Sequence, residues 1–371
     1  MSVPLRQSIA VGRYLMRRRL KGDEKFPLLV ELEPLFQCNL ACSFCGKIQY
    51  PQEILKKRMP VDQAIAAIEE SGAPMVSIAG GEPLVHPEVH VIAQELIKRK
   101  KFVYLCTNGI LMKKKLDNFE PSPYFAWVVH LDGMRERHDQ FVEREGIFDK
   151  CVEAIKEAKA RGFRVNTNTT FLNTDTPKTV RDVLDFLNDE LKVDAMQISP
   201  AYAYEKAPDQ EHFPGVTQTR KLFSEAFAGG RRKKWRLNHT PLFLDFLEGK
   251  VDYQCTPWGI PSYSIFGWQR PCYLMSDGYA TTYRELIEET DWSKYGRGRD
   301  ERCDNCMAHC GYEPTAVFAT GRSLRESWVK KVVLVVTRKP RALAALIAAT
   351  ALSKTPSRST DSSWRSRRPS M

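Results

Sequence analysis

The stretch CNLACSFC, residues 38–45, places three thiols within eight positions, separated by three and then two residues. Thiolates at this spacing can converge on one metal centre. A closed tetrahedral zinc site needs four ligands, and iron–sulfur cubanes usually take four cysteines as well. Cys38, Cys42 and Cys45 have no fourth ligand nearby in the sequence, so they predict a cluster with one iron open to a small molecule. Three structural or zinc-binding cysteines on a loop are the alternative.

Segments of strand length alternate with helical patterns up to about residue 200. Six segments are predicted as strands: residues 27–37, 75–79, 102–107, 125–131, 163–171 and 194–199. Between two of them, residues 89–97 carry apolar side chains at positions i, i+3, i+4, i+7 and i+8, which is a helical period. Strands that alternate with helices form βα units around a parallel sheet. Residues at the strand ends are then expected at the barrel mouth, where such folds hold their chemistry.

A glycine-rich loop follows the second predicted strand. It consists of Gly80, Gly81, Glu82 and Pro83. Two adjacent glycines let the backbone approach a ligand closely, because no Cβ atom intervenes. Taken alone, this tetrapeptide is merely a turn signal. Its position one βα unit after the cysteine loop indicates a second part of the same site.

The cysteine run, the glycine loop and their order resemble the radical S-adenosylmethionine (SAM) superfamily. The resemblance implies an α/β fold, a partial (βα)6 TIM-like barrel with a cysteine-containing C-terminal extension. It also implies that Cys38, Cys42 and Cys45 hold a [4Fe-4S] cluster whose open iron is chelated by SAM, the co-substrate. Residues 80–83 are then expected to bind the amino group of SAM's methionine part. An external electron donor of flavodoxin or ferredoxin type is implied as partner.

Two later strand ends carry polar side chains. His130 and Asp132 alternate on an otherwise apolar strand and therefore share a face. Family members often have Ser-x-Asp there, which implies that Asp132 holds the SAM ribose and leaves the role of His130 open. Asn166 and Asn168 likewise share a face, and Asn168 is predicted to contact SAM. Ordinary hydrogen bonds to neighbouring loops are the alternative for each residue.

Cys106 ends the third predicted strand, with no other cysteine near it in the sequence. A buried free cysteine usually behaves as a small hydrophobe, and this is the default interpretation. A thiol at a barrel mouth can instead donate a hydrogen atom to a carbon radical, which makes Cys106 a candidate catalytic residue. Cys151, inside an amphipathic helical pattern, is interpreted as packing.

Five further cysteines follow the predicted barrel, namely Cys255, Cys272, Cys303, Cys306 and Cys310. The last three are spaced like a metal site. Residues 271–278 are predicted as a hairpin with an Asp-Gly turn. The pattern loosely resembles C-terminal extensions of radical SAM enzymes that bind an auxiliary iron–sulfur cluster. Because the spacing differs from theirs, zinc, a second cluster and plain thiols all remain open.

The segments around the motifs narrow the reaction further. Residues 31–36, 198–207 and 266–272 resemble radical SAM enzymes of hopanoid biosynthesis, over roughly residues 1–328. The resemblance implies a hydrophobic triterpene substrate, diploptene (hopene), whose alkene takes up the 5′-deoxyadenosyl radical to give adenosylhopane. Two other classes remain: another radical SAM reaction, such as peptide or small-molecule modification with an auxiliary cluster, and a non-catalytic zinc protein.

The positive charge of the chain is concentrated at its end. The 371 residues carry a formal charge of +11, but residues 329–371 contain ten Lys and Arg and one acid. The rest is nearly neutral, which argues against a nucleic-acid partner. Four parts are predicted: a basic amphipathic segment at 1–26, the barrel at 27–240, the extension at 241–328 and a basic tail at 329–371, disordered or on a membrane surface.

Cysteine usage and the N-terminal segment together suggest a location. Ten cysteines without a secretory signal at the start predict a reducing, cytoplasmic setting. Residues 11–20 combine apolar side chains with four arginines and suit an anionic membrane surface. A solvated helix packed on the barrel fits this pattern equally well. The expectation is a cytoplasmic protein with peripheral contact to the inner face of the membrane.

Overall fold

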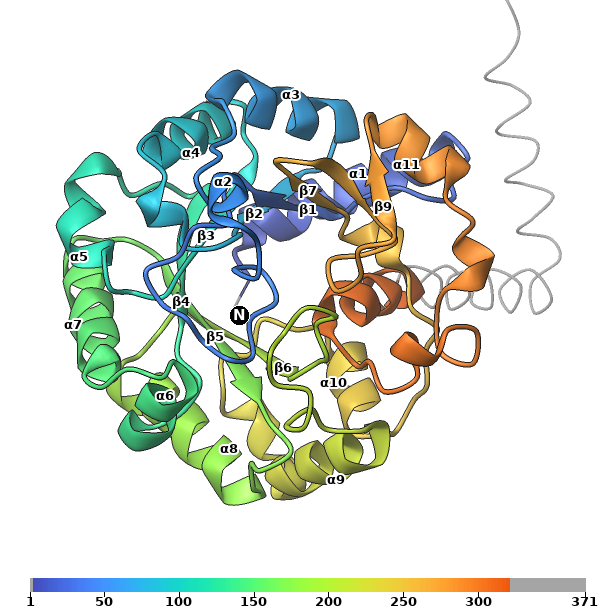
Figure 1. Ribbon diagram of the computed structural model, residues 1–371. Coiled ribbons are helices and arrows are strands. Elements are labelled where there is room, and N and C mark those ends of the chain that lie inside the picture. Colours follow the sequence, from blue (N-terminus) through green and yellow to red (C-terminus); the bar gives the residue numbers. More distant parts are fainter. Residues whose placement is uncertain (1–2, 321–371) are drawn as a thin grey trace, which may run out of the picture. The chain divides into compact units, whose positions relative to one another are not determined.

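Six parallel strands curve around the interior of the computed structural model, which describes residues 3–320 (Figure 1). They are β1 Leu29–Glu33, β2 Met75–Ile78, β3 Phe102–Thr107, β4 Phe125–His130, β5 Val165–Phe171 and β6 Ala195–Pro200. Each strand pairs in parallel with the next, as a series of βα units requires. All six overlap the predicted strands, and the partial barrel is confirmed.

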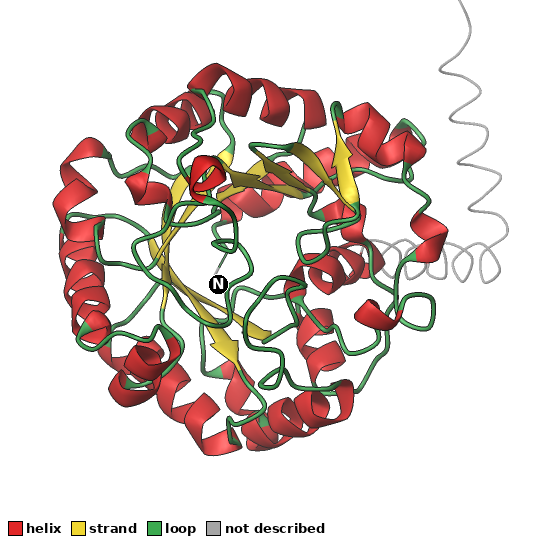
Figure 2. Ribbon diagram, in the orientation of Figure 1, coloured by secondary structure: helices red, strands yellow, loops and turns green. Residues whose placement is uncertain are grey.

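Helices cover the outside of the barrel (Figure 2). The helices between the strands are α2 Gln52–Leu55, α3 Val61–Ser71, α4 Val89–Lys98, α5 Met112–Lys115, α6 Arg135–Phe141, α7 Ile147–Ala160 and α8 Pro177–Asp185. After β6 come α9 Val216–Ala226, α10 Pro241–Leu247, α11 Tyr283–Glu289 and helical residues 309–320. Helix α4 coincides with the predicted apolar stripe and buries it against the sheet.

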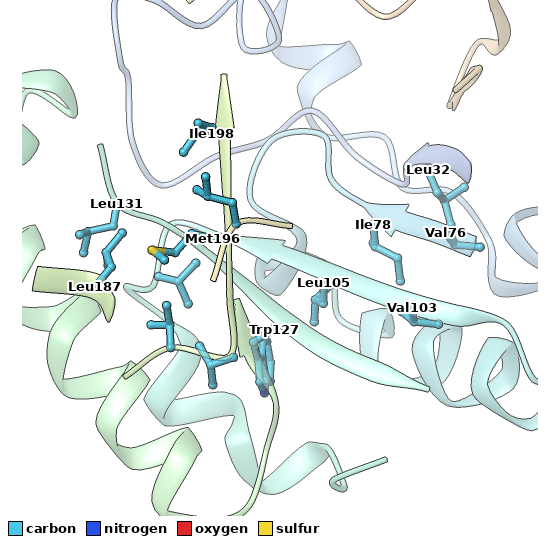
Figure 3. Close-up of a cluster of buried hydrophobic side chains, with 14 of the residues drawn as sticks. Leu32, Val76, Ile78, Val103, Leu105, Trp127, Leu131, Leu187, Met196 and Ile198 are labelled. Atoms are coloured by element: carbon cyan, nitrogen blue, oxygen red, sulfur yellow. The ribbon is translucent and has the colours of Figure 1, made fainter. Parts of the chain in front are cut away.

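The hydrophobic core lies between the sheet and these helices. Successive side chains of a strand point to opposite faces, so every second strand residue packs outward against the helices. The fully or almost fully buried residues labelled in Figure 3 are Leu32, Val76, Ile78, Val103, Leu105, Trp127, Leu131, Leu187, Met196 and Ile198. The remaining strand residues face the interior of the barrel, which leaves that side free for function.

The C-terminal extension prolongs the same sheet beyond β1. Strand β7 Ser262–Ser264 pairs in parallel with β1, and β8 Gly267–Arg270 and β9 Gly278–Ala280 follow as antiparallel strands. The predicted hairpin exists, but its Asp-Gly turn does not. Gly278 is already paired with Arg270 inside the ladder, and residues 271–277 form a longer connection that carries Cys272.

The predicted segment boundaries at residues 26 and 240 do not separate independent bodies. Helix α1 Leu5–Leu20, the barrel and the chain up to Phe318 belong to one unit. The predicted basic tail, residues 329–371, lies outside the described residues. Within residues 3–320, no helix is both long enough and apolar enough to span a bilayer.

Candidate active site

A cavity of about 620 Å³ occupies the interior of the barrel. At one end its wall is formed by the cysteine loop, residues 38–45, which follows the C-terminal end of β1. At the other end its wall is helix α1, which contributes Val11 and Leu15. This helix lies at the opposite strand ends, since Gln7 Nε2 is 3.2 Å from the sulfur of Met75, the first residue of β2. The cavity therefore extends along the barrel from one end to the other.

The cavity wall has a polar and an apolar level. The polar level takes one residue from each strand of the barrel: Glu31, Ser77, Cys106, His130, Asn168 and Gln197. The register pairs Glu31 with Ser77 and His130 with Asn168, whereas Ser77 is also paired with Tyr104, and Cys106 with Val128. On β1 to β4, the residue two positions earlier, toward α1, also lines the cavity. These residues are Leu29, Met75, Tyr104 and Val128. We call these two levels the polar belt and the apolar floor.

The glycine loop is joined to the chain that leads into the cysteines. The Gly81 amide donates to the carbonyl of Leu35 (3.0 Å), and the Glu82 amide donates to that of Gln37 (2.9 Å). A Cβ atom on Gly81 would lie 2.2 Å from the Gln37 carbonyl oxygen. The sequence predicts that Gly81 makes room for a ligand. The structure shows that it makes room first for the backbone that positions the cysteine loop.

Glu82 is a buried support of this loop. Its side chain accepts hydrogen bonds from the Thr107 hydroxyl and the Asn108 amide, both at 2.8 Å, and from the Leu84 amide at 3.1 Å. Burial raises the pKa of Glu82 to about 7, although these hydrogen bonds act in the opposite direction. Pro83 is buried beside it and also lines the cavity. The loop therefore links the ends of β1, β2 and β3 at the cavity mouth.

His130 and Asp132 occupy different positions from those the sequence suggests. Asp132 is fully buried, and its two oxygens accept from His130 (2.5 Å) and from the Thr170 amide (2.7 Å). It is not part of the cavity wall, whereas His130 is. Burial lowers the pKa of His130, but the adjacent Asp132 carboxylate outweighs this effect and raises it. In the structure Asp132 holds His130 on the cavity wall, and a direct contact of Asp132 with the SAM ribose stays a prediction.

Asn168 lies on the cavity wall next to His130. Its side-chain oxygen is buried and has no hydrogen-bond partner. A buried polar atom without a partner is costly, so a ligand that donates to this oxygen would stabilise the site. Asn166, on the same strand face, is buried but is not part of the cavity wall. Only the second of the two asparagines is therefore placed for ligand contact.

Cys106 belongs to the polar belt and is linked to two neighbours. Its sulfur lies 3.4 Å from the Ser77 hydroxyl, and Ser77 in turn is hydrogen-bonded to Glu31. Burial raises the pKa of the Cys106 thiol to about 12 and that of Glu31 to about 8. Both groups therefore carry their protons at neutral pH. Cys151, by contrast, is fully buried outside the cavity, which confirms its packing role.

The structure brings the five C-terminal cysteines together. Burial raises the pKa of the Cys255 thiol. Negative charges on the four other cysteines would raise this pKa further, because all four lie close to it: Cys272, Cys303, Cys306 and Cys310. Four of the five pack around the buried Leu274, Met275 and Ala308, next to Tyr202 and Tyr204. Cys310, Tyr202 and Tyr204 also line the cavity, so this cysteine group adjoins the candidate active site.

The chemistry of the cysteine loop suits an iron–sulfur cluster. Cysteine thiolates are the usual ligands of such clusters, and a cubane distributes them over different irons. Three thiols from this loop and the unpartnered oxygen of Asn168 line the same cavity, which fits a cluster with SAM bound beside it. For the C-terminal cysteines, zinc, a second cluster and plain thiols stay open.

Two elements of the site are not identified by the sequence analysis. Glu31 is an acidic residue in the middle of an apolar strand, and its alternation with the buried Val30 and Leu32 is the signal that could have found it. Helix α1 is expected either at an anionic membrane surface or packed on the barrel, and its amphipathic pattern does not reveal that one side closes the cavity.

Comparison with protein families agrees with this geometry. Residues 32–187 match the model of the radical SAM superfamily, and residues 196–330 match a domain of unknown function, DUF3463. Together with the barrel and the cysteine loop, these matches identify residues 32–187 as a radical SAM domain, which is followed by an additional C-terminal domain. The cofactors of the radical SAM domain are a [4Fe-4S] cluster and SAM.

Curated relatives share part of the chain. GTP 3′,8-cyclase 1 of Mycobacterium tuberculosis is 24% identical over 206 residues, which cover 51% of this chain and 56% of the relative. Fe-coproporphyrin III synthase of Methanosarcina barkeri is 24% identical over 158 residues, 42% of this chain and 39% of the relative. The chain spans about half the length of such relatives, and neither name concerns a hopanoid.

Solved structures share the fold. Streptococcus suis SuiB bound to its precursor peptide SuiA has a TM-score of 0.60 at 13% identity, covering 80% of this chain and 73% of that chain. The enzyme anSMEcpe with bound AdoMet has a TM-score of 0.53 at 18% identity, covering 81% and 99%. At such identities the likeness concerns the fold alone.

Proposed function

We propose that this radical SAM enzyme adds the 5′-deoxyadenosyl group of SAM to the alkene of a rigid, apolar polycyclic hydrocarbon, diploptene (hopene), and so forms adenosylhopane. The observation that carries the proposal is the division of the cavity into a polar belt and an apolar floor. SAM is charged and matches the belt beside the cysteine loop. A hydrocarbon needs apolar walls with few polar groups, which the floor offers.

The chain's own residues bind and orient the reactants. Cys38, Cys42 and Cys45 hold the cluster, which when bound supplies the electron that cleaves SAM. Asn168 accepts a hydrogen bond from SAM through its unpartnered oxygen. His130 contacts SAM through Nε2, because its Nδ1 is engaged by Asp132. The reaction then depends mainly on holding the alkene close to the adenosyl carbon while water is excluded.

The charges around the cavity argue against a polyphosphate substrate. Among the described residues that line it there is no arginine, and the one lysine is Lys47. Lys47 Nζ is paired with the buried carboxylate of Glu33 at 2.9 Å, so its charge is already compensated. A triphosphate would need unpaired cations around it. This observation favours an uncharged partner over a GTP-like one.

Cys106 is the proposed hydrogen donor. Addition of the adenosyl radical to the alkene forms one carbon–carbon bond and leaves an unpaired electron on the tertiary carbon. Transfer of the thiol hydrogen of Cys106 saturates that carbon and leaves a thiyl radical. One electron from the external donor and one proton restore the thiol. Ser77 and Glu31, which carries a proton at neutral pH, provide a route for that proton.

Product analysis tests the proposal. Reconstituted enzyme is incubated anaerobically with SAM, reductant and hopene, and the lipid extract is examined by mass spectrometry. The expected product is hopene plus one adenosyl group and one hydrogen. Free 5′-deoxyadenosine without any adenosylated lipid, at matched SAM turnover, would refute the proposed reaction but not the radical SAM chemistry.

A second candidate is another radical SAM reaction, on a peptide or a small molecule, that uses an auxiliary cluster. The five gathered cysteines favour it, and so do the names of the relatives, none of which points to a hopanoid. The same assay separates the two candidates, since most reactions of this second kind release 5′-deoxyadenosine instead of retaining it in the product.

A further inference from the structure

Helix α1 has two functional sides. Its inner side lines the cavity with Gln7, Val11 and Leu15. Arg18, also on the inner side, is paired with Asp23 just after the helix and donates to the carbonyl of Ser71 at the end of α3. The helix is therefore fixed on the barrel, and its outer side is presented in a defined orientation.

The outer side carries an apolar stripe. Leu5, Ile9, Met16 and Leu20 are 65%, 45%, 65% and 83% exposed. At about 100° per residue, these four positions fall within roughly 60° of one another around the helix axis. In the described part of the chain the only other exposed large hydrophobic residue is Met134. Single exposed apolar residues need no explanation, but a row of four on one helix does.

Cations border this stripe on one side. Arg6, Arg13 and Arg17 are exposed and lie next to the stripe on the helical wheel, within about 120° of Leu5. The helix contains no Asp or Glu. An apolar row with adjacent arginines is the pattern of a helix that lies in the headgroup region of an anionic bilayer. Water-soluble partners that bind arginines do not require the apolar row.

We infer that the outer face of α1, comprising the four apolar and three arginine side chains named above, docks the protein on anionic membrane surfaces. The same helix closes the cavity at the end of the apolar floor, so the width of one helix separates the bilayer from the cavity. A substrate that resides in the bilayer would then be taken up at the α1 end, opposite the cysteine loop. This last step rests on the proposed function, whereas the docking does not.

Vesicle binding tests the docking with the full-length chain. Co-sedimentation is measured with phosphatidylcholine vesicles and with vesicles that also contain phosphatidylglycerol, at low and high salt. The wild type should bind the anionic vesicles, and Ile9→Glu/Met16→Glu should abolish binding. Arg13→Gln/Arg17→Gln should weaken it about tenfold and reduce its salt dependence. Because all four side chains are exposed, melting temperatures should not change.

Matched controls come from elsewhere on the surface. Met134→Glu changes the other exposed apolar residue, and Lys156→Gln removes an exposed cation on α7. Both should bind like the wild type. Unchanged vesicle binding by the Ile9→Glu/Met16→Glu protein overturns the inference and moves any membrane contact to another part of the chain. Absence of wild-type binding overturns it as well.

Activity separates docking from the reaction. With hopene embedded in anionic vesicles, the Ile9→Glu/Met16→Glu protein should form at least about tenfold less product, whereas with detergent-solubilised hopene it should match the wild type. If no adenosylated lipid forms in either format while vesicle binding follows α1, the proposed function fails and the docking stands. Equal loss of activity in both formats would contradict uptake from the bilayer at the α1 end.

Discussion

Single residues of the polar belt have separable chemical roles, and Cys106 is the clearest case. Cys106→Ala should still cleave SAM and form the carbon–carbon bond, yet most of the saturated product should be replaced by alkene or other diverted species. In heavy water the wild-type product should gain deuterium at the former alkene carbon, because thiol protons exchange with solvent. Cys151→Ala removes a buried thiol outside the cavity and is the control. Wild-type product purity from Cys106→Ala would leave Cys106 as packing.

Glu31 should make stability depend on pH. Burial, reinforced by the charge of Glu33, raises the pKa of Glu31 from about 4.5 to about 8. In that window the folded protein holds a proton that the unfolded chain has released, so the free energy of unfolding falls as pH rises. Glu31→Gln should flatten the decline in melting temperature across this range by a few degrees. Glu82, whose pKa is also raised, makes stability fall with rising pH in the same way, so the Glu31→Gln variant should keep part of the decline in melting temperature. Identical slopes would contradict the assigned protonation.

At this scale the sequence identifies residue types better than contacts. Cys38, Cys42 and Cys45 are recognisable because their spacing alone brings three thiols to one loop. The burial of Asp132 beside His130 is not recognisable, because it depends on the Thr170 amide reaching the carboxylate from the next strand. Such contacts depend on the register between neighbouring strands, which cannot be read from the sequence.

Among the structural elements, the two loops at the cavity mouth act as one. Gly81→Val would push a side chain into the Gln37 carbonyl, so the chain before the cysteines must move. Iron content and SAM affinity should therefore fall together, whereas a role of Gly81 in ligand contact alone would weaken SAM binding more than it changes cluster content. Gly12→Ala adds a methyl group in open space on α1 and should keep both. Full iron content with weakened SAM binding would favour the simpler, ligand-contact explanation.

Elements whose sequence has a strong hydrophobic period can be predicted. Elements whose position depends on contacts with distant parts of the chain cannot. The six barrel strands and α4 follow from apolar runs and stripes that few other structures can bury. The connection at residues 271–277 is longer than the Asp-Gly signal indicates, because Gly278 is already paired in β9. Helix α1 is predictable as amphipathic, but its place across one end of the cavity depends on contacts with Met75 and Tyr104.

On the scale of the whole molecule, two groups of cysteines flank one cavity. The loop at residues 38–45 contributes three thiols to its wall, and Cys310 contributes one from the C-terminal group. Tyr202 and Tyr204 line the cavity and pack against that second group. A second cluster there would lie within the same unit as the first and could pass electrons to the region of Cys106. Only with such a cluster would the C-terminal domain have a role in the chemistry beyond support of the barrel.

Iron counting decides whether the second group binds a cluster. If both groups hold [4Fe-4S] clusters, the reconstituted wild type should contain about eight irons per chain, and the triple variant Cys38→Ala/Cys42→Ala/Cys45→Ala should keep about four. The triple variant should lose SAM cleavage, because its remaining cluster has no open iron at the cavity. Cys303→Ala/Cys306→Ala should also keep about four irons but retain SAM cleavage, with Cys151→Ala as the full-iron control. A triple variant without any iron would show that the C-terminal cysteines hold no iron–sulfur cluster, and the second candidate function would lose its main support.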